Sequence, residues 1–175
     1  MRTIVSVLLL GISTLVFGQQ GANRSSGVSR QQLIGVWQEG SATVGDALRK
    51  NFQFFSDGRF VLNFSQYNDI SAVRGLGGQY RLDSSGLFLI ADYRKEIVGG
   101  TFEKGNPGVE SEEFVLTGGK LQTIRQKPDS DSYVDPYLIS PCKPEKKAGG
   151  HPCVVINYNT YYKLNDNPQF YDKKK

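Results

Sequence analysis

The sequence predicts an all-β fold, an eight-stranded antiparallel up-and-down barrel. Short runs alternate apolar and polar residues, and tight-turn signals such as Asp-Gly separate these runs. No sustained helical period interrupts residues 35–162. The 175 residues include 20 Gly, 10 Phe and 9 Tyr, a composition typical of strands joined by tight turns. Because consecutive hairpins need no long crossovers, they favour a closed barrel over a two-sheet sandwich.

A short apolar segment begins the chain. Arg2 precedes an apolar run over residues 4–17, which is shorter than the roughly 20 residues that a membrane span needs. Val16 and Gly18 are small enough for the positions before a cleavage site. We therefore expect a signal peptide over residues 1–18, cleaved after Gly18, and a secreted or periplasmic protein without a membrane span. A buried N-terminal helix and retention as an uncleaved membrane anchor are the alternatives.

The mature chain divides into three parts. Residues 19–30 are polar and lack periodicity, which predicts a disordered leader. Residues 31–165 form the expected domain, and residues 166–175 end in a basic tail. Loss of Arg2 leaves 20 of the 21 basic side chains against 17 acidic ones. Because this small excess is not clustered outside the tail, we expect no nucleic-acid partner.

The predicted elements follow in order along the domain. A short helical turn is expected at residues 31–34. The eight strands are expected at residues 35–44, 51–55, 60–65, 77–82, 87–93, 113–116, 121–125 and 154–162. The clearest hairpin has Asp57-Gly58 at its turn. Because side chains alternate between faces with period two, the apolar residues on either side of this turn share one inner face.

Three segments resemble the lipocalin-like families of the calycin group. Leu33-Ile34-Gly35-Val36-Trp37 contains the Gly-x-Trp signature at the entry to the first strand. The hairpin from Phe52 to Phe60 and the segment Gly78-Gln79-Tyr80 follow in the same order. The resemblance implies that Gly35 and Trp37 close one end of the barrel, and that a basic residue packs over the tryptophan ring. Arg125 is the expected basic residue, and a solvent-facing Arg125 is the alternative.

The resemblance also implies that a small apolar or amphipathic ligand binds inside the barrel. Inward aromatic and aliphatic side chains would line the pocket, with tyrosine hydroxyls as its polar groups. The candidate lining residues are Phe52, Phe54, Phe60, Leu62, Phe64, Tyr80, Tyr158 and Tyr162. In the alternative hypothesis these side chains fill the barrel, and the protein binds an envelope partner or acts as an inhibitor through loop 127–152.

The two cysteines lie on this long proline-rich loop. Cys142 and Cys153 enclose ten residues in a chain that we expect to be exported, so one structural disulfide is predicted. A redox-active pair lacks the usual Cys-x-x-Cys spacing. Intermolecular pairing, free thiols and a metal site that also uses His151 remain alternatives. We predict no bound metal.

Known catalytic signatures are absent from the sequence. It contains no Gly-x-Ser-x-Gly, His-Glu-x-x-His, phosphate loop or dinucleotide fingerprint. Asp129, Asp131 and Asp135 only loosely follow the spacing of a calcium loop and lack its glycine and glutamate. We therefore expect a protein that is not an enzyme and needs no cofactor.

Overall fold

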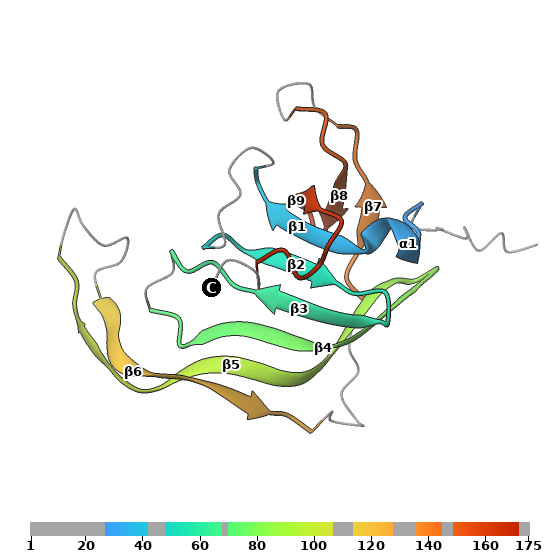
Figure 1. Ribbon diagram of the computed structural model, residues 1–175. Helices are drawn as coiled ribbons and strands as arrows, with labels where there is room; N and C mark the ends of the chain where they lie inside the picture. Colours follow the sequence, from blue (N-terminus) through green and yellow to red (C-terminus); the bar gives the residue numbers. More distant parts are fainter. Residues whose placement is uncertain are drawn as a thin grey trace, which may run out of the picture.

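The computed structural model describes residues 27–41, 48–67, 70–106, 114–127, 136–144 and 149–171, and these residues form an all-β fold (Figure 1). The described elements are one short helix and nine strands. They are α1 (Arg30–Leu33), β1 (Gly35–Glu39), β2 (Asn51–Phe54), β3 (Arg59–Asn63), β4 (Val73–Asp83), β5 (Gly86–Lys104), β6 (Phe114–Arg125), β7 (Ile139–Pro141), β8 (Cys153–Ile156) and β9 (Asn159–Asn165). Within these ranges no helix is both long enough and apolar enough to cross a membrane.

All nine strands belong to one antiparallel sheet in the order β6-β5-β4-β3-β2-β1-β9-β8-β7. The all-β, antiparallel prediction is thus confirmed, and the first strand pairs with the last, as a barrel requires. The predicted closed eight-stranded barrel is wrong for the described residues, because β6 and β7 end the sheet without pairing with each other. Figure 1 shows a strongly curled sheet whose β5 and β6 extend beyond β1–β3.

Within the described residues, an isolated bridge joins β5 to the segment before β7. Tyr137, which precedes β7, exchanges two backbone hydrogen bonds with Leu87 at the beginning of β5, at 2.8 and 3.0 Å. β5 then continues to Lys104, and from Tyr93 onward it pairs with β6 rather than β7. The described sheet therefore curls around its interior, but no continuous strand pairing closes it into a barrel.

The strand boundaries differ from prediction at two glycine pairs in β5 and β6. Residues 113–116 and 121–125 were expected as separate strands around a turn, but β6 continues without a break. Gly118 and Gly119 both have positive φ, yet Gly118 pairs with Gly100 of β5. Because Gly99 also has positive φ, the two strands bend together at this point, and the glycines mark a bend instead of a turn.

The expected last strand at residues 154–162 is two strands. Asn157 (φ 44°) and Tyr158 (φ 69°) form a two-residue turn between β8 and β9. Positive φ at both central residues is the geometry of a type I′ hairpin turn. The turn reverses the chain, and β9 pairs with both β8 and β1. The alternation of inward and outward side chains in β8 therefore does not continue unchanged into β9.

The ends of the domain differ from the predicted boundaries. The expected helical turn at residues 31–34 is present as α1, one residue earlier, because the Ser29 hydroxyl and the Gln32 side chain form a capping box. Val28 is only 8% exposed and packs in the core, so residues 27–30 belong to the domain rather than to the leader. At the other end the Tyr171 hydroxyl donates a hydrogen bond to Gln38 Oε1 at 3.1 Å. The predicted signal peptide lies outside the described residues.

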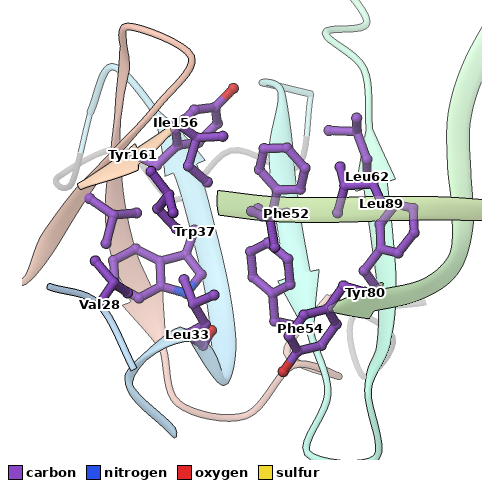
Figure 2. Packing of buried hydrophobic residues seen from close by; sticks show 14 residues of the cluster. Val28, Leu33, Trp37, Phe52, Phe54, Leu62, Tyr80, Leu89, Ile156 and Tyr161 are labelled. Atoms are coloured by element: carbon purple, nitrogen blue, oxygen red, sulfur yellow. The ribbon is translucent and has the colours of Figure 1, made fainter. Parts of the chain in front are cut away.

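An aromatic cluster forms the centre of the core (Figure 2). The rings of Phe52 and Phe54 stack with their centroids 5.3 Å apart. Phe54 meets the edge of Tyr80 at 5.0 Å, and Phe52 meets Tyr161 at 5.2 Å. The predicted inner face of the hairpin is confirmed, since Phe52, Phe54, Phe60 and Leu62 are at most 3% exposed.

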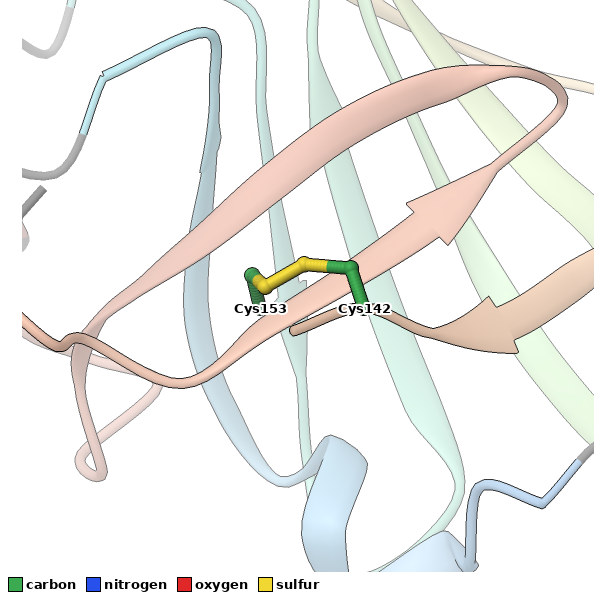
Figure 3. Close-up of a disulfide and its surroundings, with 2 residues drawn as sticks. All are labelled: Cys142 and Cys153. Atoms are coloured by element: carbon green, nitrogen blue, oxygen red, sulfur yellow. A yellow bond between two sulfur atoms is a disulfide. The ribbon is translucent and has the colours of Figure 1, made fainter. Parts of the chain in front are cut away.

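The predicted disulfide between Cys142 and Cys153 is present (Figure 3). It joins the residue after β7 to the first residue of β8, with the Cα atoms 5.4 Å apart. β7 has only three residues, so the covalent bond supplements a short ladder. Closing a loop of this length stabilises a fold by roughly 3 kcal/mol in the chain-entropy model.

The positive φ of Tyr158 predicts that a glycine at this position stabilises the protein. Tyr158→Gly should raise the free energy of unfolding by about 0.5–1 kcal/mol, because glycine adopts positive φ without the steric cost of a Cβ atom. Tyr158→Ala keeps the Cβ atom and is the matched control, for which we expect no gain. Urea denaturation of the three proteins measures the effect. A Tyr158→Gly protein that is no more stable than Tyr158→Ala would contradict the prediction.

Candidate ligand-binding site

A cavity of about 290 Å³ lies on the inner face of the curled sheet. One wall comes from β2, β3 and β4, and the other from β8, β9 and Tyr137, two residues before β7. The residues that line it are Lys50, Phe52, Leu62, Phe64, Leu76, Tyr137, Ile156, Asn157, Asn159 and Tyr161. Three of the eight predicted lining residues, Phe52, Leu62 and Phe64, are among them.

The apolar wall follows directly from strand register. Phe52 lies opposite Leu62 in the β2–β3 pair, and Leu62 lies opposite Leu76 in the β3–β4 pair. Directly opposed residues of antiparallel strands project from the same face. The three side chains therefore form a continuous apolar row across three neighbouring strands, with Phe64 beyond the end of β3.

The other half of the interior is filled with side chains. Phe54, Phe60 and Tyr80, which were predicted to line the ligand pocket, are packed in the core and do not line the cavity (Figure 2). The Tyr80 hydroxyl donates to the Phe55 carbonyl at 3.1 Å, which satisfies its polar atom inside the protein. Leu33 packs at the same end with no exposed surface. The interior is thus half closed by core packing and half open.

The two C-terminal tyrosines of the predicted lining lie elsewhere. Tyr158 is 86% exposed at the tip of the β8–β9 turn. Tyr162 packs against Cys153 and Cys142, outside the main core cluster. Tyr161 lines the cavity in their place. The turn at Asn157 explains this difference, because it changes which residues of the segment face inward.

Trp37 is buried, and the basic residue over its ring is not the expected Arg125. The Trp37 indole donates to the Leu33 carbonyl at 2.6 Å, and Lys163 Nζ lies 5.5 Å from the ring centroid. Lys163 also donates to the Gln32 carbonyl at 3.3 Å. Arg125 ends β6, opposite Tyr93. Because β9 pairs with β1, the basic residue comes from the last strand rather than from β6.

Gly35 has a specific role at this end of the sheet. Its φ is 127°, and a Cβ atom there would lie 2.4 Å from the Asn165 carbonyl oxygen. Any side chain would separate the beginning of β1 from the end of β9. The Gly-x-Trp pair therefore brings the first and last strands together.

Polar groups gather at the open end of the cavity. Lys50 Nζ lies 5.9 Å from the centre of the Tyr161 ring and 3.8 Å from Glu39 Oε1. The Tyr161 hydroxyl donates to the same carboxylate oxygen at 3.4 Å. Burial, together with the nearby Glu39 carboxylate, raises the pKa of Tyr161 well above its ordinary value. Its hydroxyl therefore stays protonated at neutral pH.

Sequence reasoning missed the polar half of this site. Lys50 precedes β2 and Asn157 occupies a turn, so neither falls in the alternating pattern that identified the apolar wall. Asn157 was the available turn signal, because asparagine tolerates positive φ. Among the described residues no group of three or more His, Cys, Asp or Glu side chains is placed to hold a metal ion.

Two other hollows flank the beginning of the described chain. One of about 470 Å³ lies between α1 and Leu82–Ser84, and one of about 270 Å³ lies beside Trp37 and Cys153. Gly27 and Val28 line both of them. The inner cavity, by contrast, is lined by residues of five strands and their flanks, so it is the candidate site.

Replacing Lys163 tests which basic residue supports Trp37. Lys163→Met should lower the free energy of unfolding by about 1–2 kcal/mol, because it removes the cation over the ring and the hydrogen bond to Gln32. Arg125→Met, an equal loss of charge on an exposed strand, should change it by less than about 0.5 kcal/mol. Urea denaturation compares the two. Equal effects would contradict the assignment.

The raised pKa of Tyr161 predicts alkaline destabilisation. The unfolded tyrosine ionises near pH 10 while the folded one keeps its proton, so the folded state binds more protons and stability falls as the pH rises. Above about pH 10 this contribution approaches 1.4 kcal/mol per pH unit. Tyr161→Phe should therefore make the pH dependence of unfolding less steep. Tyr158→Phe, which removes an exposed tyrosine, is the control. An unchanged slope in Tyr161→Phe would contradict the prediction.

Comparisons of this chain with protein-family models, with curated proteins and with solved structures found no match. The resemblance to lipocalin-like families therefore stays a prediction that rests on the quoted motifs. What the protein does has to be argued from the geometry and chemistry of the inner cavity.

Proposed function

We propose that the protein is exported from the cytoplasm and binds a small amphipathic or apolar ligand in the inner cavity. The observation that carries this proposal is the cavity itself, with an apolar row on one wall and polar groups at one end. Binding sites for small molecules commonly combine an apolar lining with a few placed polar groups. The apolar N-terminal segment and the Cys142–Cys153 disulfide support an exported protein.

The cavity volume limits the size of the ligand. A water molecule occupies about 30 Å³ in the liquid, and a methylene group is of similar size. A cavity of about 290 Å³ therefore holds roughly ten non-hydrogen atoms. A chain of about eight carbons with one polar head matches this volume, whereas a sterol-sized ligand does not.

The arrangement of the interior gives the ligand a direction. The end near Trp37 is closed by packed side chains, while the side chain of Lys50 at the other end is 28% exposed. An apolar tail would lie along Phe52, Leu62 and Leu76, and a polar head would remain near solvent.

A surface function is the second candidate, and the filled half of the interior favours it. Phe54, Phe60 and Tyr80 form a core that needs no ligand. In this case the protein would bind an envelope partner or act as an inhibitor through loop 127–152. Within loop 127–152, the structure describes only residues 127, 136–144 and 149–152. The cavity therefore carries the main proposal.

Filling the cavity tests the proposed function. Leu76→Trp should weaken binding of 1-octanol by at least about tenfold, or 1.4 kcal/mol, because the indole occupies the space of the tail. Ile90→Trp adds the same ring at a side chain that is 43% exposed and outside the cavity lining, so it should bind like the unaltered protein. Isothermal titration calorimetry measures both, and circular dichroism checks that each variant is folded.

Two results would contradict this function. The first is that the unaltered protein binds no 1-octanol at millimolar concentration. The second is that folded Leu76→Trp binds as well as Ile90→Trp, which would place the binding outside the cavity. Either result would favour the surface function.

A further inference from the structure

We propose that the ligand has an anionic head group, a carboxylate or a similarly small oxyanion, which binds Lys50. This inference rests on the proposed function and adds the chemical class of the ligand. It follows from the hydrogen-bond donors of Lys50 and Asn157 at the cavity and from the position of the Glu39 carboxylate beside Lys50.

Lys50 is the only charged residue in the cavity lining, as far as the described residues show. Its side chain is 28% exposed, so the ammonium group is partly removed from water. A partly buried cation gains more from a direct anionic partner than a fully exposed one, because water screens the interaction less. The remaining polar lining consists of two asparagines and two tyrosines.

Glu39 lies behind Lys50 instead of in the cavity. Its Oε1 atom is 3.8 Å from Lys50 Nζ and also accepts the Tyr161 hydroxyl at 3.4 Å, but Glu39 does not line the cavity. An ammonium group has three donors, and a contact of 3.8 Å is longer than a strong hydrogen bond. Lys50 therefore has donors left for a ligand, while Glu39 holds the ammonium at the cavity wall.

Asn157 adds to this donor character. Its side-chain oxygen accepts the Leu138 backbone N–H at 2.8 Å, and its own N–H donates to the Leu138 carbonyl at 2.9 Å. With the oxygen engaged, the amide NH₂ is the group that Asn157 retains for a ligand. Asn159 lines the cavity two residues further on. A head group that only accepts hydrogen bonds fits this surrounding better than one that only donates them.

Three ligands of equal chain length separate the head-group classes. Octanoate, 1-octanol and octylammonium present an anion, a neutral hydroxyl and a cation on the same tail. Isothermal titration calorimetry at pH 7.5 should rank octanoate tightest, by about five- to tenfold over 1-octanol, and octylammonium weakest. Added salt should weaken octanoate binding and leave 1-octanol binding unchanged.

Variants assign the preference to Lys50. Lys50→Met should bring octanoate binding to the level of 1-octanol while retaining 1-octanol binding within about twofold, since only the charge is removed. Lys120→Met, which removes an exposed charge on β6, should leave the ranking intact. Glu39→Gln should strengthen octanoate binding, because it removes the competing carboxylate. If Lys50→Met is unfolded, Lys50→Gln takes its place.

The outcomes distinguish this inference from the proposed function. If none of the three ligands binds the unaltered protein, the proposed function fails, and this inference with it. If 1-octanol binds in the cavity and octanoate binds no more tightly, the function stands and the anionic head group is overturned. A preference for octanoate that survives in both Lys50 variants would likewise overturn the role of Lys50 while leaving the function in place.

Discussion

The packing of Trp37 is the constraint on which the rest of the structure depends. Its indole N–H is bound to the last residue of α1, and the β9 residue Lys163 lies over its ring. One side chain therefore connects the helical turn, the first strand and the last strand. The pairing of β1 with β9 curls the sheet, and a curled sheet is what gives the inner face a hollow.

The interior of the curled sheet has a filled part and an open part. Phe54, Phe60 and Tyr80 belong to the buried core, and the ring centroids of Phe54 and Tyr80 are 5.0 Å apart. Two residues further along β3, Leu62 lies opposite Leu76 of β4, and both leucines line the cavity. The same alternating pattern thus builds both a rigid core and a cavity.

The sequence predicted the parts of the fold that depend on local pattern. The Phe52–Phe60 hairpin, its inner face, the helical turn and the disulfide are present because alternation, turn residues and cysteine spacing act over short distances. The prediction of a closed barrel was wrong because closure depends on how far β5 extends. No local sequence pattern limits the length of this strand. Part of the polar end of the site was missed for a similar reason. Lys50 and Tyr161 meet only because residues distant in the chain share the curled sheet.

The open edge of β6 affects the behaviour of the protein in solution. Among the described residues, the unclosed sheet leaves one side of this strand without a β partner, and Phe114 and Leu121 on it are 50% and 61% exposed. Both charged residues of β6, Lys120 and Arg125, are basic. Two such edges therefore repel each other, and this repulsion is weakened by salt, whose screening length is about 8 Å at physiological ionic strength. Added salt should therefore promote edge-to-edge association of the protein. A closed barrel has no free edge and would not need this protection.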